Sequence, residues 1–337
     1  GTDRPVFSRS LASRHDALLV DLDGTLIRGT QPIPGVAQAL EASGLPVVYV
    51  TNNASRAPSD TAAHLQGMGY SARTDEVMTS AQAAVVMLAE HVAPGARVLV
   101  VGHDSFRDLV RQAGYEVVLS ADEHPEAVLQ GLSRELTWSD LAEGCLAIRT
   151  GIPWIASNTD ATLPTERGLL PGNGSLVTAM KTATDREPVV AGKPAAGVLH
   201  AAAALADAKR PLVVGDRLDT DIEGAVAAGM PALMVLTGVH GPSDLLAAPP
   251  FRRATHLAYD LATVNATGED PQIATAAEII GSVVAGVLLV EELPSGLQGV
   301  ALARAVIRHG WEHGASRVDA DTPMVRSRLA DAGFVVG

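Results

Sequence analysis

Two aspartates separated by one residue follow a short apolar run near the start of the chain. The run Ala17–Val20 leads directly into Asp21 and Asp23. In an extended chain this spacing directs both side chains to the same side. One carboxylate of a close pair can stay ionised while the other holds a proton. The pattern therefore indicates that one aspartate of the pair is a nucleophile and the other holds a proton.

Other polar residues could help this pair to attack a phosphate ester. A carboxylate alone would be repelled by a phosphate dianion, so the reaction needs positive charge. Asp216 offers a further carboxylate for a hard, oxygen-seeking cation such as Mg²⁺, and Lys193 offers a fixed charge. Thr51 offers a hydroxyl donor for a phosphoryl oxygen. These residue types favour magnesium-assisted phosphoryl chemistry.

Strand-like and helix-like segments alternate around these residues, which is typical of a parallel sheet. We predict strands at Ala17–Val20, Leu45–Val50, Pro188–Val190, Leu212–Val214 and Ala232–Leu236, and helices at Gly35–Ala42, Ser59–Met68, Ala196–Ala208 and Asp221–Ala228. Ligands of open parallel sheets bind at the carboxyl ends of the strands. Because the polar clusters follow predicted strands, we expect them to converge on one crevice.

The pattern predicts an α/β protein with a doubly wound, Rossmann-like parallel-sheet core. The core comprises residues 11–80 and 183–264, with an α/β cap domain inserted at 81–182 and a short α/β unit at 265–337. Further strands are expected at Val98–Val101, Glu116–Leu119 and Leu146–Ile148 in the cap and at Ser282–Glu291 in the tail, with tail helices at Val300–His313 and Met324–Ala332.

Four motifs occur in a fixed order along the chain. They are Asp21-Leu22-Asp23-Gly24-Thr25-Leu26, Thr51-Asn52-Asn53, Gly192-Lys193-Pro194, and Gly215-Asp216 continuing to Asp221. Together they resemble the motifs of the haloacid dehalogenase (HAD) superfamily, in the branch of small-molecule phosphatases that carry a large α/β cap. The resemblance covers roughly residues 15–262, and four ordered motifs are far more specific than any one of them.

The resemblance implies a role for each motif residue. Asp21 is expected to become phosphorylated, while Asp23 protonates the leaving oxygen and later activates water. Thr51 is expected to hold the phosphoryl group, and Lys193 to offset its charge. A bound Mg²⁺ is expected to be held by Asp21, the backbone carbonyl of Asp23 and Asp216, with Asp221 hydrogen-bonding behind the ligands.

Substrate contacts are expected from four other polar residues. Asn52 and Asn53 lie in the second motif, and Asn158 and Asp160 belong to a Ser-Asn-Thr-Asp sequence similar to a Thr-Asn-x-Asp pattern common in the family's caps. For Asn158 and Asp160, a simple turn-forming role is about as good an interpretation. The cap sequence does not specify which ester is bound.

The tail is similar to the second half of a GNAT-type acetyltransferase, although it is too short for a complete one. With such a partial tail the chain resembles bacterial glycerol-phosphate phosphatases, and this resemblance implies glycerol 3-phosphate as the favoured substrate. Phosphoglycolate, pyridoxal phosphate and nucleotides stay open, as does phosphoryl transfer to a sugar. A different class of function is a module that binds a coenzyme or a partner through the tail. The tail is expected to pack against the core or to mediate homo-oligomer assembly.

Composition limits the remaining classes. The formal charge of -13 argues against nucleic-acid binding, which needs clustered Lys and Arg. The apolar run Ile279–Val290 is shorter than the roughly 20 residues of a membrane helix. The single cysteine, Cys145, permits no internal disulfide and fits a reducing cytosol. We therefore expect a cytoplasmic enzyme acting on a small phosphorylated metabolite.

Overall fold

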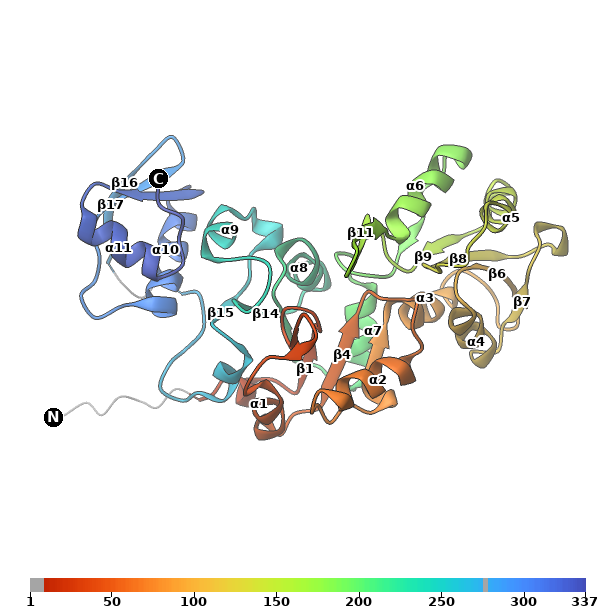
Figure 1. Cartoon of the computed structure of the whole chain (residues 1–337), viewed down its shortest axis with the longest axis horizontal. Coiled ribbons are helices and arrows are strands. Elements are labelled where there is room, and N and C mark those ends of the chain that lie inside the picture. Colours follow the sequence, from red (N-terminus) through yellow and green to blue (C-terminus); the bar gives the residue numbers. More distant parts are fainter. Residues whose placement is uncertain (1–8, 275–277) are drawn as a thin grey trace. The chain divides into compact units, whose positions relative to one another are not determined.

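The computed structural model describes residues 9–274 and 278–337 (Figure 1). The chain forms two compact units: unit 1 comprises Gly1–Val47 and Asp207–Gly337, and unit 2 comprises Val48–Ala206. The predicted domain limits at 80/81, 182/183 and 264/265 are a finer division and stay predictions.

Unit 1 is built on a buried parallel sheet. Its strands lie in the order β15 (His256–Ala258), β14 (Ala232–Val235), β13 (Pro211–Gly215) and β1 (Ala17–Val20). Every residue of the four strands is buried, because a parallel sheet covered on both faces needs continuous apolar strands. The register pairs Val20 with Val214, so the residues that follow these two strands are neighbours.

Short helices and turns complete the core part of unit 1. They are α1 (Val36–Ser43), α8 (Glu223–Ala228) and α9 (Pro242–Ala247), with the small hairpin β2 (Ile27–Arg28) and β3 (Gln31–Pro32), a π-helical turn at Leu218–Ile222, and 3-10 turns at Ala12–Arg14, Pro250–Arg252 and Leu261–Asn265. Gly35 and Gly44 flank α1 with positive φ angles, a conformation that favours glycine.

The tail belongs to unit 1 and forms a three-stranded mixed sheet. Strand β17 (Val287–Glu292) pairs antiparallel with β16 (Ile280–Val284) and parallel with β18 (Arg317–Ala320). Two helices, α10 (Gly299–Glu312) and α11 (Pro323–Asp331), accompany the sheet. The predicted single strand Ser282–Glu291 is therefore wrong: Ala285 and Gly286 adopt positive φ and turn the chain into a hairpin.

The tail packs against the core part of unit 1 through α10. Buried Arg304 donates through Nε to the backbone oxygen of Leu257 on β15, at 2.7 Å. The indole Nε1 of Trp311 donates to the backbone oxygen of Leu245 on α9, at 3.1 Å. The expected packing of the tail on the core is confirmed by these contacts. Assembly through the tail stays a prediction.

Unit 2 contains two groups of parallel strands. Strand β4 (Val47–Thr51) pairs with β5 (Val77–Thr79). A five-stranded sheet has the order β12 (Val189–Val190), β9 (Trp154–Ala156), β8 (Ala127–Gln130), β6 (Arg97–Val101) and β7 (Glu116–Val118). The remaining elements are α2 (Pro58–Gly67), α3 (Ser80–Leu88), α4 (Asp104–Gln112), α5 (Trp138–Ile148), α6 (Asn173–Thr184), α7 (Gly197–Leu205), the hairpin β10 (Thr162–Thr165) and β11 (Gly168–Pro171), and 3-10 turns at Thr74–Glu76 and Ala121–Glu123.

One prediction for unit 2 is wrong, and one confirmed strand joins a different sheet from the one expected. The apolar segment Leu146–Ile148 is the last turn of α5, whose Ala147 and Ile148 pack into the core of the five-stranded sheet. The short strand at Val189–Val190 pairs with β9 in this same sheet, so Lys193 follows a strand of the second sheet rather than a core strand. Short apolar runs do not reveal which sheet they join, because partner choice depends on contacts far away in sequence.

Within residues 9–274 and 278–337, no helix combines the length and the apolar character that crossing a membrane would require.

The α/β class is confirmed by these parallel sheets, and the C-terminal mixed sheet is the expected short third element.

Candidate active site

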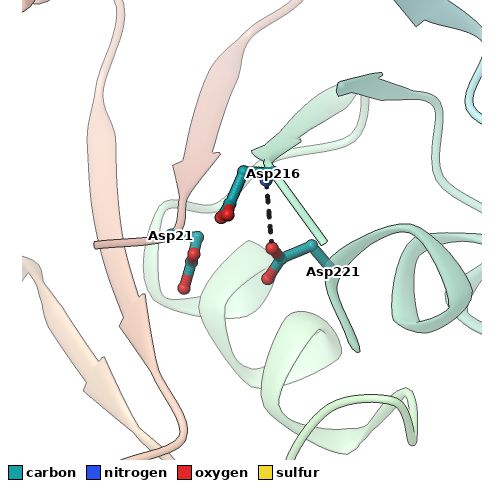
Figure 2. A group of neighbouring side chains, drawn as sticks. All are labelled: Asp21, Asp216 and Asp221. Atoms are coloured by element: carbon teal, nitrogen blue, oxygen red, sulfur yellow. Dashed lines mark hydrogen bonds between the residues drawn. The ribbon is translucent and has the colours of Figure 1, made fainter. Parts of the chain in front are cut away.

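Asp21 and Asp216 lie at the carboxyl ends of neighbouring strands of unit 1. Asp21 donates its backbone N–H to the oxygen of Val214 at 3.0 Å, which continues the ladder between β1 and β13. Carboxylate oxygens of Asp21, Asp216 and Asp221 all lie within 4.8 Å of one another (Figure 2). The predicted convergence of the first and fourth motifs is thus confirmed, although 195 residues separate Asp21 from Asp216 in the chain.

The Asp216 carboxylate is fully buried and held by donors from two other loops. Its Oδ2 accepts from the backbone N–H of Val239 at 2.8 Å, and its Oδ1 accepts from the Thr25 hydroxyl at 3.4 Å. Burial raises the pKa of Asp216 above its ordinary value, and the nearby charge of Asp221 raises it further. A cation among these carboxylates would remove both penalties.

Asp221 supports the loop that carries Asp216. This aspartate is buried in the π-helical turn, and its Oδ2 accepts from the backbone N–H of Asp216 at 3.2 Å (Figure 2). The same oxygen accepts from the backbone N–H of Arg217 at 3.1 Å. The side chains of Arg217 and Asp219 form a half-exposed ion pair at 2.8 Å. Asp221 thus fixes the backbone of the loop, in keeping with a place behind the metal ligands.

Two glycines allow the backbone to approach the Asp216 carboxylate. A Cβ atom at Gly238 would lie 1.9 Å from Asp216 Oδ2, and one at Gly24 would lie 2.3 Å from the same atom. Gly24 also has a φ of +82°, which side chains disfavour. Both positions therefore require glycine if the carboxylate is to stay where it is.

The loop that follows β14 is a part of this site that the sequence patterns did not reveal. The Thr237 hydroxyl donates to the backbone oxygen of Gly24 at 2.7 Å, and the Arg28 guanidinium donates to the backbone oxygen of Thr237 at 3.1 Å. His240 Nδ1 accepts from the backbone N–H of Leu218 at 2.9 Å. The available signal was a polar Thr-Gly pair directly after a predicted strand, as in the other motifs.

Asp23 lies apart from the three clustered carboxylates. Its side chain is exposed, and its backbone forms an isolated bridge to Ile27 in the turn that follows Asp21. An exposed carboxyl group in this turn is accessible to water and to a leaving group, which suits acid–base work.

All four residues predicted to contact the substrate, which lie in unit 2, form hydrogen bonds with other residues of this chain. Asn52 contacts the backbone of Lys193, Asn53 Oδ1 accepts from the backbone N–H and the hydroxyl of Ser55, and Asn158 Nδ2 donates to the backbone oxygen of Asn52. Asp160 is half-buried and donates its backbone N–H to Asn158 Oδ1 at 3.2 Å. These contacts favour loop-building roles for the three asparagines.

Comparison with known proteins identifies the family. A family model described as haloacid dehalogenase-like hydrolase matches residues 18–116, and a HAD-hydrolase-like model matches residues 190–264. The D-glycerol 3-phosphate phosphatase of Mycobacterium tuberculosis is 45% identical over 334 residues, which cover 95% of this chain and 95% of that protein. The chain belongs to the haloacid dehalogenase-like hydrolases.

A solved structure and a second relative are similar to this chain over different lengths. The crystal structure of the glycerol phosphate phosphatase from Mycobacterium tuberculosis in complex with magnesium has a TM-score of 0.91 at 45% identity, covering 97% of this chain and 100% of that one. The acid sugar phosphatase of Staphylococcus saprophyticus is 37% identical over 230 residues, which cover 67% of this chain and 88% of that protein.

The matched regions contain all four motifs of this HAD-like chain. The first region includes Asp21, Asp23 and Thr51, and the second includes Lys193 and Asp216. Both models end before the tail, so the likeness of residues 265–337 to an acetyltransferase stays a prediction.

Proposed function

We propose that the protein is a magnesium-dependent phosphatase that hydrolyses glycerol 3-phosphate. The observation that carries the proposal is the cluster of Asp21, Asp216 and Asp221, with carboxylate oxygens within 4.8 Å of one another, in a HAD-like chain. The substrate is carried over from the D-glycerol 3-phosphate phosphatase of Mycobacterium tuberculosis, which matches this chain over 95% of its length, tail included.

The acidic cluster fits a magnesium ion. Its ligand atoms are carboxylate oxygens, which hard divalent cations prefer, and burial, followed by the nearby charge of Asp221, raises the pKa of Asp216, so a cation would stabilise the ionised carboxylates. Asp21, Asp216 and the backbone oxygen of Asp23 would hold the ion, with Asp221 positioning the Asp216 loop. When bound, the ion neutralises charge so that a phosphate dianion can approach a carboxylate.

The residues of this chain would then act in two steps. In the first, an oxygen of Asp21 attacks phosphorus, the bond from phosphorus to the glycerol oxygen breaks, and Asp23 gives its proton to that oxygen. In the second, Asp23 takes a proton from water, which attacks the phosphorus of the aspartyl-phosphate and releases inorganic phosphate and free Asp21. Thr51 and Lys193 would bind the phosphoryl oxygens by hydrogen bonding and by charge.

The proposal is tested by phosphate release from purified protein. Glycerol 3-phosphate should be hydrolysed faster than phosphoglycolate, pyridoxal phosphate, a nucleoside monophosphate or a sugar phosphate, and a chelator should abolish turnover until Mg²⁺ is restored. Absence of phosphate release from every ester in the presence of Mg²⁺ contradicts hydrolysis. Preference for another ester contradicts only the assignment of glycerol 3-phosphate as the substrate.

Phosphoryl transfer to a sugar is distinguished by the acceptor. In water labelled with heavy oxygen, hydrolysis places one labelled oxygen in each released phosphate. Transfer to a sugar releases no inorganic phosphate, because the phosphoryl group stays on the sugar. Cytoplasmic location, homo-oligomer formation and coenzyme binding by the tail stay predictions.

A further inference from the structure

One asparagine side chain holds both backbone polar groups of Lys193. Asn52 Oδ1 accepts from the backbone N–H of Lys193 at 2.9 Å, and Asn52 Nδ2 donates to the backbone oxygen of Lys193 at 2.8 Å. Two hydrogen bonds from one planar amide to one residue fix both the position and the orientation of its backbone. We refer to this pair of bonds as the Asn52 clamp.

The Asn52 clamp is itself held from two sides. The backbone oxygen of Asn52 accepts from the Ser80 hydroxyl at 2.7 Å and from Asn158 Nδ2 at 2.6 Å. Ser80 is the first residue of α3, and Asn158 follows β9 of the five-stranded sheet. All of these residues belong to unit 2. The peptide that follows Asn52 is therefore anchored to two other segments of the same unit.

The chain before Lys193 is shaped to reach the clamp. Gly192 donates its backbone N–H to the oxygen of Ser157 at 2.7 Å, which extends the pairing of β12 with β9 by one step. A Cβ atom at Gly192 would lie 2.6 Å from the oxygen of Ser157 and 2.8 Å from Asn52 Oδ1. Only glycine allows this approach, which explains the glycine that precedes Lys193 in the motif.

The clamp uses the hydrogen-bonding capacity of the Asn52 side chain on protein groups. Its Oδ1 is bonded to the Lys193 N–H, and its Nδ2 donates to the Lys193 oxygen and lies 3.5 Å from Asp160 Oδ1. A substrate oxygen that accepted from Asn52 Nδ2 would have to displace either Asp160 Oδ1 or the backbone oxygen of buried Lys193. Thr51, one residue before Asn52, carries the hydroxyl assigned to a phosphoryl oxygen.

We propose that Asn52 is a positioning residue, whose side chain sets the Lys193 ammonium relative to Thr51 and does not itself contact the substrate. This inference rests on the proposed function, because it assumes that Lys193 offsets charge on a phosphoryl group. Misplacing a catalytic group by about 1 Å can lower the rate by roughly a hundredfold. The role differs from the substrate contact that the motif alone suggests.

The test is a double-mutant cycle between Asn52 and Lys193. We expect Asn52→Ala to lower kcat/KM for glycerol 3-phosphate at least tenfold in the otherwise unchanged protein, but less than twofold in a Lys193→Ala background, since there is no ammonium left to position. The inhibition constant of inorganic phosphate should rise in the same non-additive way. Asn265→Ala is the matched control, because Asn265 donates to a backbone oxygen, that of Ala39, in unit 1.

The outcomes separate the inference from the proposed function. An equal loss from Asn52→Ala in both backgrounds would overturn the clamp role, since it would mean that Asn52 acts independently of Lys193. If Asn52→Ala does not fold by circular dichroism, Asn52→Asp replaces it, because it is isosteric but puts a carboxylate oxygen against the Lys193 oxygen. If the unmodified protein hydrolyses no ester, the proposed function fails. The same double-mutant cycle is then measured as the affinity for inorganic phosphate by calorimetry.

Discussion

His256 makes the stability of unit 1 depend on pH. Its ring is buried in β15, with 7% of the residue exposed, and Nδ1 lies 2.7 Å from the Thr255 hydroxyl. Burial, followed by repulsion from His15 and other cations, lowers the pKa of His256 to about 4. The folded state therefore holds the neutral ring, whereas the unfolded chain takes up a proton near the ordinary value of 6.5.

The magnitude follows from this difference. A shift from 6.5 to about 4 corresponds to about 3.4 kcal/mol at roughly 1.36 kcal/mol per pKa unit. Because the folded pKa is the lower one, the unfolded state binds the extra proton as the pH falls. Stability is therefore fully present above pH 6.5, falls between 6.5 and about 4, and is constant below that range. Between pH 7.5 and 5.0 the loss from His256 is about 2 kcal/mol.

The assay is urea unfolding followed by circular dichroism at pH 7.5 and 5.0, with a chelator present so that metal release makes no contribution. Between pH 7.5 and 5.0, the free energy of unfolding should fall by about 2 kcal/mol less in His256→Gln than in the unmodified protein. His64→Gln, at an exposed position on α2, should leave the pH dependence unchanged. If His256→Gln and the unmodified protein lose the same free energy, the buried neutral histidine is not a source of acid sensitivity.

Three further perturbations probe the site and the tail. Asp21→Asn should abolish phosphate release while the circular dichroism spectrum is retained; turnover at the normal rate would exclude Asp21 as the nucleophile. Gly238→Ala should weaken Mg²⁺ binding about tenfold in calorimetry, since its Cβ would lie 1.9 Å from Asp216 Oδ2, whereas Gly268→Ala has open space and should have no effect. A chain ending at residue 264 should have a lower melting temperature and solubility, because it uncovers α9 and β15; equal behaviour would show that the tail does not stabilise the core.

The catalytic strands could be predicted from sequence because their physical situation is simple. Strands β1 and β13 are buried on both faces, so they are uniformly apolar, and each ends abruptly in aspartate or glycine followed by aspartate. The ordered motifs then specify which polar groups act together. These features are local, and the parallel sheet brings the strand ends together without further information.

The wrong secondary-structure predictions arose where a local sequence pattern fits two different structures. The apolar end of α5 resembles a buried strand, since a short apolar run does not distinguish a helix from a strand. The run Ile279–Val290 contains two glycines, Gly281 and Gly286, of which Gly286 lies in the turn, and Ala285 adopts a φ of 52° that is uncommon for alanine. The hydrogen bonds of Asn52 and Thr237 join segments far apart in sequence, so their roles required the folded chain.

The two units carry different parts of the proposed chemistry. The three clustered carboxylates belong to unit 1, and Thr51, Asn52 and Lys193 belong to unit 2. Each set is held by hydrogen bonds within its own unit. The backbone N–H of Val239 donates to the Asp216 carboxylate in unit 1, and the Asn52 side chain accepts from the backbone N–H of Lys193 in unit 2. Substitutions in the first set should therefore alter Mg²⁺ affinity, and those in the second should alter phosphate affinity. Effects should be non-additive within a set for residues joined by hydrogen bonds, because such residues share one local structure.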